Sequence, residues 1–413
     1  MMTYDAIVIG GGPAGATTAT VLAQHGRRVL LLERESFPRF HIGESLMPYT
    51  WFSFERLGVL DWLKRSGSPR KHSVQFVSTS GNVSQPFYFF ETIKHDCAST
   101  WQILRSDFDT MMLENAAAKG AEVRQGVAVR DVLMEGDRVI GVQADGADGK
   151  LEKHLASVVV DATGRDTLLA GRLGCKRRDP DLTKIAIFTY FTGALRDPGL
   201  DEGATTVAYI PEKGWFWYIP LVNDMVSVGV VADHDYLYRG TRDPEMIFQR
   251  EAKGCRWIRD HLAQGTRLNS MRVTGEFSYR ATTAAGDGFC LVGDAFSFLD
   301  PVFSSGVFLA LKSGELAADA IHVGLDGGDI TASTFDGYTR EVCRTLDSFR
   351  QIVMAFYDRT FSFGAFLGAH PDLQPLLVDA LVGNVSDGLQ PLLDALGAFM
   401  KRTDRRPADA MSP

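Results

Sequence analysis

The sequence has few cysteines, no long apolar run and no excess of positive charge. Its five cysteines include no Cys-x-x-Cys pair, which argues against a zinc site or a disulfide framework and fits a reducing compartment. We therefore expect a cytoplasmic protein without a bound metal. Because no stretch of about 18 apolar residues occurs, we expect no transmembrane helix. The formal net charge of −8 argues against a dedicated nucleic-acid binder.

What is present is the composition of an ordinary folded protein. Of the 413 residues, 45% are hydrophobic and 23% are charged, which is not the composition of a disordered chain. At roughly 150 residues per domain, this length predicts about two to three structural units. The chain has 41 glycines, and the motifs around the glycine clusters carry the functional information.

The first such cluster lies between a predicted strand and a predicted helix. Residues 4–9 form an apolar run that predicts a buried strand, and residues 16–24 have a helical pattern. Gly10, Gly12 and Gly15 between them fit the pattern GxGxxG. In this pattern the first glycine makes the tight turn, the second lets a pyrophosphate approach the backbone, and the third lets the helix pack on the strand. We expect a dinucleotide phosphate at the N-terminus of the helix.

A second predicted strand supports the dinucleotide site. Residues 28–32 form this strand, and it ends at Glu33, which lies 18 residues after Gly15. An acid in this place accepts hydrogen bonds from an adenosine ribose. A glycine-rich turn that binds no ligand is the alternative interpretation.

Three later motifs point to FAD. A predicted helix opens at Arg105, a strand ends in a turn with Asp161 and Gly164, and another strand ends at Gly293 and Asp294. Together and in this order they resemble the para-hydroxybenzoate-hydroxylase-like flavoproteins over nearly the whole chain. By this resemblance Arg105 contacts the flavin or its diphosphate, and Asp161 and Gly164 flank the cofactor. Gly293 allows a close approach, and Asp294 binds the ribityl or pyrophosphate region.

Each of these motifs also has a simpler interpretation. Arg105 and Asp109 could form a surface pair on a helix, and Asp161 could be a turn residue. No second GxGxxG motif for NAD(P)H is visible, so a reductase with two dinucleotide sites is disfavoured. We expect reduced flavin to come from a partner flavin reductase.

Three further segments narrow the subgroup: FHIGESLMP at 40–48, GWFWYIP at 214–220 and DPVFSSG at 300–306. They resemble the flavin-dependent halogenases, specifically the phenol- and pyrrole-type branch. Trp215, Trp217, Ile219 and Pro220 match the WxWxIP pattern of that family without a departure. The resemblance implies that a flavin hydroperoxide oxidises chloride or bromide to hypohalous acid. A lysine then holds or relays the oxidant through a tunnel toward an electron-rich aromatic.

The resemblance assigns two candidate catalytic residues. Lys71, in the segment 70–76, matches the family lysine, although Ser73 stands where the family usually has a glycine. An exposed lysine at a strand edge is the alternative. Glu44, in the Gly-Glu-Ser segment, would lie near the flavin and the lysine and could tune either. The alternative for Glu44 is a satisfied acid at the N-terminus of the following helix.

The resemblance also implies a halide site and a tunnel wall. Ser304, Ser305 and Gly306 open a helix whose backbone N–H groups would bind halide against the flavin face. A hydroxylase or a reductase would use the same groups on an oxygen of the flavin. Trp215 and Trp217 share one face of a strand and would wall the tunnel, or they belong to the sheet core.

The region before the Ser-Gly pair and the C-terminal region bear on the substrate. Tryptophan-type halogenases have a glutamate just before the Ser/Thr-Gly pair, and this region reads Val302-Phe303 here, so a phenol or a pyrrole is favoured over an indole. Phe349, Phe356 and Phe363 share one face of a predicted helix, as core or as a lid over the cavity. Tyr357 is the candidate that faces the substrate tunnel. Many relatives have a longer C-terminal domain than this chain, so we expect either a more open pocket or a large substrate. A substrate bound to a carrier protein is therefore expected alongside small aromatic molecules.

The expected fold class is α/β. We expect a discontinuous Rossmann-like FAD-binding domain over 1–180 and 276–330, with a mixed or antiparallel substrate-domain sheet inserted over 181–275. The segment 331–413 is expected to be helical. Three alternatives to a halogenase share this fold: an FAD-dependent aromatic hydroxylase, a flavin reductase similar to the geranylgeranyl reductases, and a non-enzymatic flavin-binding protein.

Overall fold

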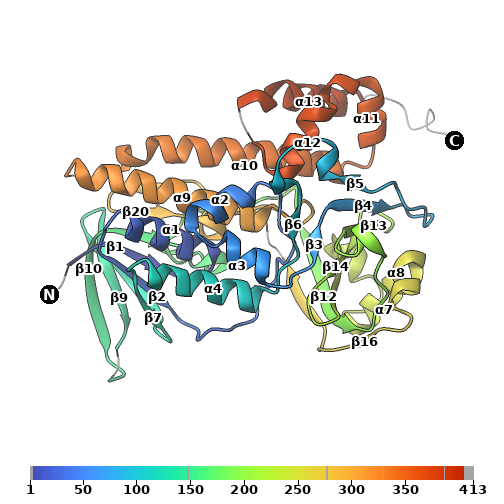
Figure 1. Cartoon of the computed structure of the whole chain (residues 1–413). Coiled ribbons are helices and arrows are strands. Elements are labelled where there is room, and N and C mark those ends of the chain that lie inside the picture. Colours follow the sequence, from blue (N-terminus) through green and yellow to red (C-terminus); the bar gives the residue numbers. More distant parts are fainter. Residues whose placement is uncertain (1–2, 147, 276–277, 329, 386, 404–413) are drawn as a thin grey trace.

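The computed structural model describes residues 3–146, 148–275, 278–328, 330–385 and 387–403. Two large sheets lie side by side, and helices cover one of them and continue into a C-terminal helical cap (Figure 1). This arrangement confirms the expected fold class, an α/β protein with a Rossmann-like sheet and a second, mainly antiparallel sheet. No helix among the described residues is long and apolar enough to span a membrane.

The first sheet holds the glycine-rich motif. Its central strand β1 pairs in parallel with β10 on one side and with β2 on the other. Ala6, Ile7 and Val8 of β1 are fully buried, which explains the unbroken apolar run in the sequence. The eight strands of this sheet are β1 (Thr3–Ile9), β2 (Val29–Glu33), β7 (Glu122–Gln125), β8 (Val129–Glu135), β9 (Arg138–Asp145), β10 (Leu151–Asp161), β19 (Ala285–Gly286) and β20 (Phe289–Leu291).

Helix α1 (Pro13–Gln24) packs against α4 (Arg105–Ala118) and the long helix α9 (Ser305–Asp326). Helices α1 and α9 come close at Gly314 of α9, where the hydroxyl of Thr18 in α1 donates a hydrogen bond to the Gly314 carbonyl at 3.3 Å. The N-termini of α1 and α9 therefore lie near the same end of the sheet, where the parallel strands end. Ligands of α/β proteins bind at this end.

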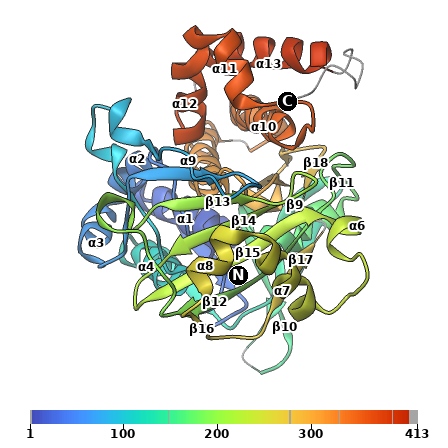
Figure 2. The same ribbon diagram turned by 90° about the vertical axis from the view of Figure 1, so that its right-hand side faces the viewer.

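The second sheet is covered on both faces. On β14 (Trp215–Pro220) the side chains of Phe216 and Tyr218 pack with helices α7 (Pro244–Gly254) and α8 (Arg256–Leu262). Trp215 and Trp217 pack on the other side with aromatic residues of α10 (Asp336–Tyr357). The strand is therefore fully buried. The eight strands of this sheet are β4 (Ser73–Val77), β5 (Phe87–Tyr88), β12 (Lys184–Thr192), β13 (Thr205–Tyr209), β14 (Trp215–Pro220), β15 (Met225–Asp233), β16 (Thr266–Arg267) and β17 (Arg272–Gly275). Seen from the side, α7 and α8 lie on its outer face (Figure 2).

This sheet extends beyond the segment 181–275 that the sequence predicts for it. Strand β13 pairs in parallel with β4, with Thr205 opposite Val74, and β4 pairs with β5. Two smaller sheets complete the fold. They consist of β3 (Arg70–Lys71) with β6 (Thr100–Trp101), and of β11 (Lys176–Arg178), β18 (Tyr279–Ala281) and β21 (Ser297–Phe298).

The C-terminal region is helical as far as the structure describes it, and residues 404–413 lie outside the described range. The single helix expected to carry Phe349, Phe356 and Phe363 is a wrong prediction, because α10 ends at Tyr357. The carboxylate of Asp358 accepts hydrogen bonds from the backbone and the hydroxyl of Thr360, both at 2.7 Å, and the chain turns there. Phe363 begins α11.

The remaining helices are α2 (Thr50–Leu57), α3 (Leu60–Arg65), α5 (Leu168–Arg172), α6 (His234–Leu237), α7 (Pro244–Gly254), α8 (Arg256–Leu262), α10 (Asp336–Tyr357), α11 (Phe363–Ala369), α12 (Gln374–Val382) and α13 (Gln390–Thr403).

Candidate active site

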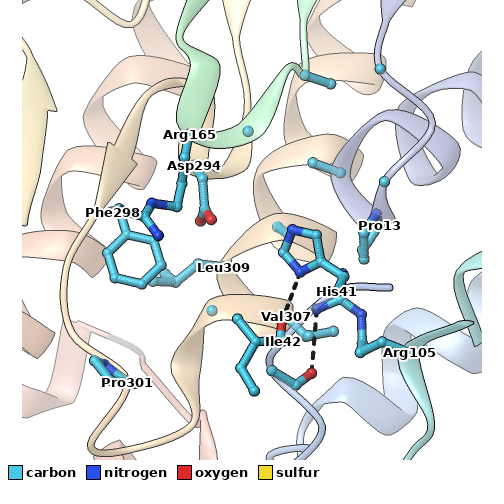
Figure 3. Close-up of a pocket in the computed structure, with 18 of the residues that line it drawn as sticks. Pro13, His41, Ile42, Arg105, Arg165, Asp294, Phe298, Pro301, Val307 and Leu309 are labelled. Atoms are coloured by element: carbon cyan, nitrogen blue, oxygen red, sulfur yellow. Dashed lines mark hydrogen bonds between the residues drawn. The ribbon is translucent and has the colours of Figure 1, made fainter. Parts of the chain in front are cut away.

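A cavity of about 690 Å³ lies between the two large sheets. Its wall contains the glycine-rich loop, the turns after β10 and β20, the N-terminus of α9 and side chains of β13 and β14. In Figure 3, Arg165 and Asp294 face His41 and Arg105 across this space. The volume of the cavity is in the range of small-molecule and cofactor sites, and its wall includes both the dinucleotide motif and the WxWxIP strand. The cavity is therefore placed to hold an extended cofactor and a second small molecule.

The glycine-rich loop fits a pyrophosphate. Gly10 has a φ of +102°, and a Cβ there would collide with the carbonyl oxygen of Ala162. A Cβ on Gly15 would collide with the carbonyl oxygen of Gly10, so both glycines are required by the protein itself. A Cβ on Gly12 would meet, among the described residues, only Nη2 of Arg39 at 3.5 Å. The open space at Gly12, at the start of α1, is where a diphosphate would lie.

Two charged residues flank this loop. Glu33 is buried in the cavity wall, and its Oε2 accepts the backbone N–H of Gly11 at 2.6 Å. Arg39 also lines the cavity; its Nη1 is buried 3.2 Å from Asp109 but has no hydrogen-bond partner in the described part of the chain. A guanidinium with an unused buried donor beside a helix N-terminus suits an anionic group of a cofactor. Sequence analysis did not identify Arg39.

Arg105 is buried, which excludes the surface pair as its interpretation. Its Nε and Nη2 donate to the two carboxylate oxygens of Asp109 at 2.8 and 2.9 Å, and Nη1 donates to the carbonyl of Ile42 at 2.7 Å (Figure 3). It thereby holds the segment of His41, Ile42 and Glu44 in the cavity wall. Burial and the positive charge of Arg105 lower the pKa of His41 to about 4, so this imidazole is neutral near pH 7.

The two later FAD motifs are placed differently. Asp161 is fully buried and is not part of the cavity wall; it accepts the backbone N–H of Thr163 at 2.9 Å and of Leu169 at 2.7 Å, and so holds the turn. Gly164 and Asp294 line the cavity. Burial raises the pKa of Asp294 to about 6, although nearby guanidinium groups favour its ionised form.

Gly293 is required by packing, because it has a φ of +56° and a Cβ on it would approach the Cβ of Ala14 in α1 to 2.9 Å. Its backbone N–H donates to Ser313 of α9 at 2.9 Å. It thus brings the strand end carrying Asp294 close to both helices. Arg165, in the turn after β10, lines the cavity and has a buried Nε without a hydrogen-bond partner among the described residues.

Glu44 lies in the cavity wall with 1% of its surface exposed. The hydroxyl of Tyr190 donates to Oε1, and the hydroxyl of Ser227 lies 3.5 Å from Oε2. Burial raises the pKa of the carboxyl to about 6, even though Tyr190 and Arg105 favour the ionised form. A carboxyl that titrates near neutral pH in a cavity can hold or release a proton. It is no helix-terminal acid, because α2 begins only at Thr50.

Lys71 is not the exposed lysine of the alternative interpretation, because only 3% of its surface is accessible. Its Nζ donates to Oγ of Ser45 at 2.9 Å and to the carbonyl of Leu46 at 3.1 Å, and lies 5.6 Å from the centre of the Phe89 ring. It forms no ion pair with any carboxylate of the described residues. Burial lowers the pKa of the amine to about 7, so ammonium and neutral amine coexist near pH 7.

Trp215 and Trp217 belong both to the cavity wall and to a buried aromatic cluster. The indole N–H of Trp215 donates to the hydroxyl of Tyr357 at 2.9 Å, and that of Trp217 donates to Ser227 at 3.1 Å. Tyr357 lies behind the wall rather than in it. Its hydroxyl reaches the two carboxylate oxygens of Asp300 at 3.1 and 3.2 Å. Asp300 lines the cavity, and burial raises its pKa to about 7.

Ser304, Ser305 and Gly306 all line the cavity at the start of α9. Ser304 is in the left-handed region with a φ of +57°, and its backbone N–H donates to the carbonyl of Pro301 at 3.0 Å. A Cβ on Gly306 would have no atom of the described residues within 4 Å. The start of this long helix therefore faces open space in the cavity, as an anion site requires.

The structure brings most of the predicted site residues to one cavity. Lys71 and Tyr357 lie directly behind its wall, and Asp161 supports a turn. Sequence analysis missed Arg39, His41 and Tyr190, and it gave no role to Asp300. Arg39 and His41 lie just before the Gly-Glu-Ser segment, and this proximity was a signal that could have found them. Tyr190 meets Glu44 only through the fold, and nothing local marks it.

Comparison with known proteins gives one family. The family model described as an FAD binding domain matches residues 3–341. The chain is 34% identical to the 1H-pyrrole-2-carbonyl-peptidyl-carrier-protein brominase of Pseudoalteromonas luteoviolacea, over 79% of this chain and 79% of the relative. It is 30% identical to the corresponding chlorinase of Pseudomonas fluorescens, over 93% and 90%.

A solved structure of a flavin-dependent brominase superposes with a TM-score of 0.88 at 30% identity, covering 98% of this chain and 100% of the other. The tryptophan 2-halogenase of Chondromyces crocatus is also similar, with 32% identity over 89% of this chain and 71% of the relative. The similar proteins thus include a tryptophan halogenase as well as pyrrole halogenases.

Proposed function

The chain belongs to the flavin-dependent halogenases built on an FAD-binding domain, and we propose that it halogenates a pyrrole- or phenol-type aromatic with chloride or bromide. The substrate is either a small molecule or an aromatic group attached to a carrier protein. Reduced FAD and O₂ are the other reactants. Lys71 is the residue that acts between the flavin and the substrate.

One observation carries this proposal: the amine of Lys71 is buried, has no carboxylate partner among the described residues, and contacts a residue of the cavity wall at 2.9 Å. Burying an amine without an anion is costly, so the chain retains it at a cost in stability. If Lys71 had only a structural role, an apolar side chain at this buried position would give a more stable protein. A halogenating enzyme needs such an amine, because ammonium donates a hydrogen bond to hypohalous acid while the apolar surroundings exclude water.

When bound, reduced FAD would supply the activation of O₂ and the oxidation of halide to hypohalous acid. The residues of the cavity wall that would hold it are Gly12, Glu33, Arg39, Arg105, Gly164 and Asp294. Gly10, Gly15 and Gly293 shape the loops around it. The backbone N–H groups of Ser305 and Gly306 at the start of α9 would hold the halide, whereas that of Ser304 donates to the carbonyl of Pro301.

The protein's own groups then orient and separate the reactants. Trp215 and Trp217 form the wall toward the second sheet and keep water out of the path to the substrate. Glu44 holds or releases a proton at Oε1 or Oε2, since its pKa of about 6 is close to neutral pH. We propose that a separate flavin reductase supplies the reduced cofactor, because the sequence has a single GxGxxG motif.

The substrate class rests on the relatives. Two of them carry names that give pyrrole-2-carbonyl groups on a peptidyl-carrier protein as the substrate. Pyrroles and phenols are electron-rich, so they react with hypohalous acid without a carboxylate at the position that tryptophan-type enzymes use. We therefore place a carrier-bound pyrrole first and a free phenol second.

The test is a product analysis. The purified protein is mixed with a flavin reductase, NADH, FAD and bromide, and with a pyrrole-2-carbonyl carrier protein, a panel of free phenols and pyrroles, or tryptophan. We expect a bromine isotope doublet on the carrier-bound pyrrole or on a member of the panel. Bromotryptophan alone would overturn the substrate class. A mass gain of one oxygen without bromine, on any of these substrates, would overturn halogenation.

A further inference from the structure

Two hydroxyl groups stand between Lys71 and the cavity. Ser45 and Thr205 line the cavity, whereas Lys71 does not. Oγ of Ser45 accepts from Nζ of Lys71 at 2.9 Å and lies 2.8 Å from Oγ1 of Thr205. All three side chains are buried, and they come from distant parts of the chain. The amine therefore communicates with the cavity through this hydroxyl pair.

Gln102 fixes the direction of these hydrogen bonds. Its Nε2 donates to the carbonyl of Gly203 at 2.9 Å and to Oγ1 of Thr205 at 2.8 Å. The opposite orientation of the amide would place its oxygen against the Gly203 carbonyl, so the nitrogen must be on this side. Thr205 is therefore an acceptor toward Gln102.

The ammonium form of Lys71 fixes the direction of the hydrogen bonds at the other end of the chain Lys71–Ser45–Thr205. Lys71 then donates to Ser45, which must turn its own proton toward Thr205. Oγ1 of Thr205 accepts from both Gln102 and Ser45, which uses both of its lone pairs. The Thr205 proton has to point elsewhere, and Thr205 lines the cavity. The chain of donors thus runs from Lys71 through Ser45 and Thr205 into the cavity.

We propose that Ser45 and Thr205 form a proton relay that connects the buried amine of Lys71 with the cavity, and that Gln102 holds the relay in its direction. The proposal deepens the function proposed above and rests on Lys71 acting in the reaction. Lys71 donates along this chain of hydrogen bonds only as ammonium, and it is restored to that state between turnovers only if protons reach it. Ser45, Thr205 and Gln102 are positioning residues for Lys71.

The relay balances at each atom. A proton leaving Nζ binds Oγ of Ser45, the Ser45 hydroxyl proton passes to Oγ1 of Thr205, and the Thr205 hydroxyl proton passes to water in the cavity. The oxygens of Ser45 and Thr205 each gain one O–H bond and lose one, so both hydroxyls are restored; the amine has lost one proton and the cavity water has gained it. The reverse sequence returns the proton to Lys71.

The chain offers a matched pair of threonines for the test. Thr206, the next residue on β13, is also buried, and its Oγ1 accepts from Nε2 of Gln75 at 2.7 Å. Side chains alternate along a strand, and Thr206 does not line the cavity. Each glutamine keeps a second acceptor when its threonine becomes valine: the carbonyl of Gly203 for Gln102, and Asp197 for Gln75.

Three variants are compared with the parent protein in halogenated product formed per flavin oxidised. We expect Thr205→Val to lower this ratio by at least about 10-fold, in line with the contribution of positioned proton transfer. Thr205→Ser keeps the hydroxyl and should stay within about twofold, as should Thr206→Val. Equal losses in Thr205→Val and Thr206→Val, or an unchanged ratio in Thr205→Val, would overturn the relay.

Lys71→Met, measured in the same series, separates the two proposals. If Lys71→Met continues to halogenate, the proposed role of Lys71 fails and the relay fails with it. If Lys71→Met forms no halogenated product while Thr205→Val equals the parent protein, the relay alone is wrong.

A second measurement needs no cofactor. The lysines are labelled with ¹³C at Cε, and the signal absent from Lys71→Met is followed through a pH titration. Removing the acceptor of the ammonium in Ser45→Ala should lower the midpoint of Lys71 by about one pKa unit, the value of one hydrogen bond to a charged group. The groups facing Nζ are the Ser45 hydroxyl, the Leu46 carbonyl and the Phe89 ring. An unchanged midpoint would show that Ser45 does not hold the amine, and would overturn the relay.

Discussion

The indole N–H of Trp215 donates a 2.9 Å hydrogen bond to the hydroxyl of Tyr357, and the same hydroxyl donates to the carboxylate of Asp300. The Tyr357 side chain thus links the end of α10 to a strand of the second sheet and to the loop that leads into α9. Two of the three residues line the cavity, and Tyr357 stands behind them. Helix α10 therefore braces the cavity wall through Tyr357, which does not itself line the cavity.

Tyr357→Phe tests this brace. The ring remains, but the Trp215 N–H and the Asp300 carboxyl lose a buried partner, so we expect unfolding in denaturant to cost about 1–3 kcal/mol less. The loosened wall should also let oxidant escape, so that peroxide release rises and product per flavin oxidised falls several-fold.

The matched control is Tyr338→Phe. Tyr338 lies on the same helix, is also buried, and donates its hydroxyl to the carbonyl of Leu291. We expect a similar loss of stability with an unchanged ratio of product to flavin. If both variants release peroxide equally, general loosening of α10 explains the effect and the brace has no specific part.

The glycines of the first loop should divide into two classes. A Cβ on Gly15 collides with backbone, so Gly15→Ala should destabilise the protein whether or not FAD is present. In the described part of the chain a Cβ on Gly12 meets only the flexible end of Arg39, so Gly12→Ala should unfold at the same denaturant concentration as the cofactor-free parent protein. It should nevertheless bind FAD at least about 10-fold more weakly, because the pyrophosphate loses its close approach. Flavin fluorescence titration measures this, and unaltered affinity in Gly12→Ala would contradict the placement of the diphosphate.

Glu44 makes stability depend on pH. The folded carboxyl has a pKa of about 6 against an ordinary value of 4.5, because burial disfavours its charge. Between these two values the folded state binds more protons than the unfolded state, so this group's contribution to stability falls as pH rises. The loss amounts to about 2 kcal/mol and is complete above pH 6.

Glu44→Gln removes the charge and keeps an oxygen that can accept from Tyr190. Relative to the parent protein, the variant should therefore gain about 2 kcal/mol of unfolding free energy between pH 4 and pH 7. Urea denaturation at several pH values measures this difference, in which the other buried acids cancel. A difference that is the same at both ends of the range would mean that Glu44 is not desolvated in the folded protein.

Local sequence pattern was sufficient for the parts of the site that one segment makes alone. The strand, the GxGxxG turn and the helix over residues 4–24 follow from the apolar run and from steric needs that the structure shows at Gly10 and Gly15. The alternation of Trp215 and Trp217 likewise places both on one face of a strand. Such features depend on neighbours within a few residues.

Features made by distant segments were not predictable in this way. The parallel pairing of β13 with β4 joins residues more than 100 positions apart, and it is this pairing that brings Thr205 close to Ser45 and Lys71. The hydroxyl of Tyr190 donates to Glu44 and that of Tyr357 donates to Asp300, and no spacing in the sequence links the two members of either pair. For Asp161 the sequence allowed a residue beside the cofactor or a turn residue, and only its hydrogen-bond partners in the fold show that it holds the turn.

If Lys71 passes oxidant from the flavin to the aromatic, Lys71→Met should abolish halogenation, because methionine keeps the length and apolar stem of the side chain but lacks the amine. Lys213→Met is the control, since Lys213 is a half-buried lysine that donates to the carbonyl of Phe361 and lies outside the cavity wall. Brominated product and flavin oxidation are measured together under reductase, NADH, FAD and bromide. We expect Lys71→Met to bind and oxidise flavin like the parent protein while brominated product disappears, and Lys213→Met to brominate normally. Undiminished bromination by Lys71→Met would contradict the account.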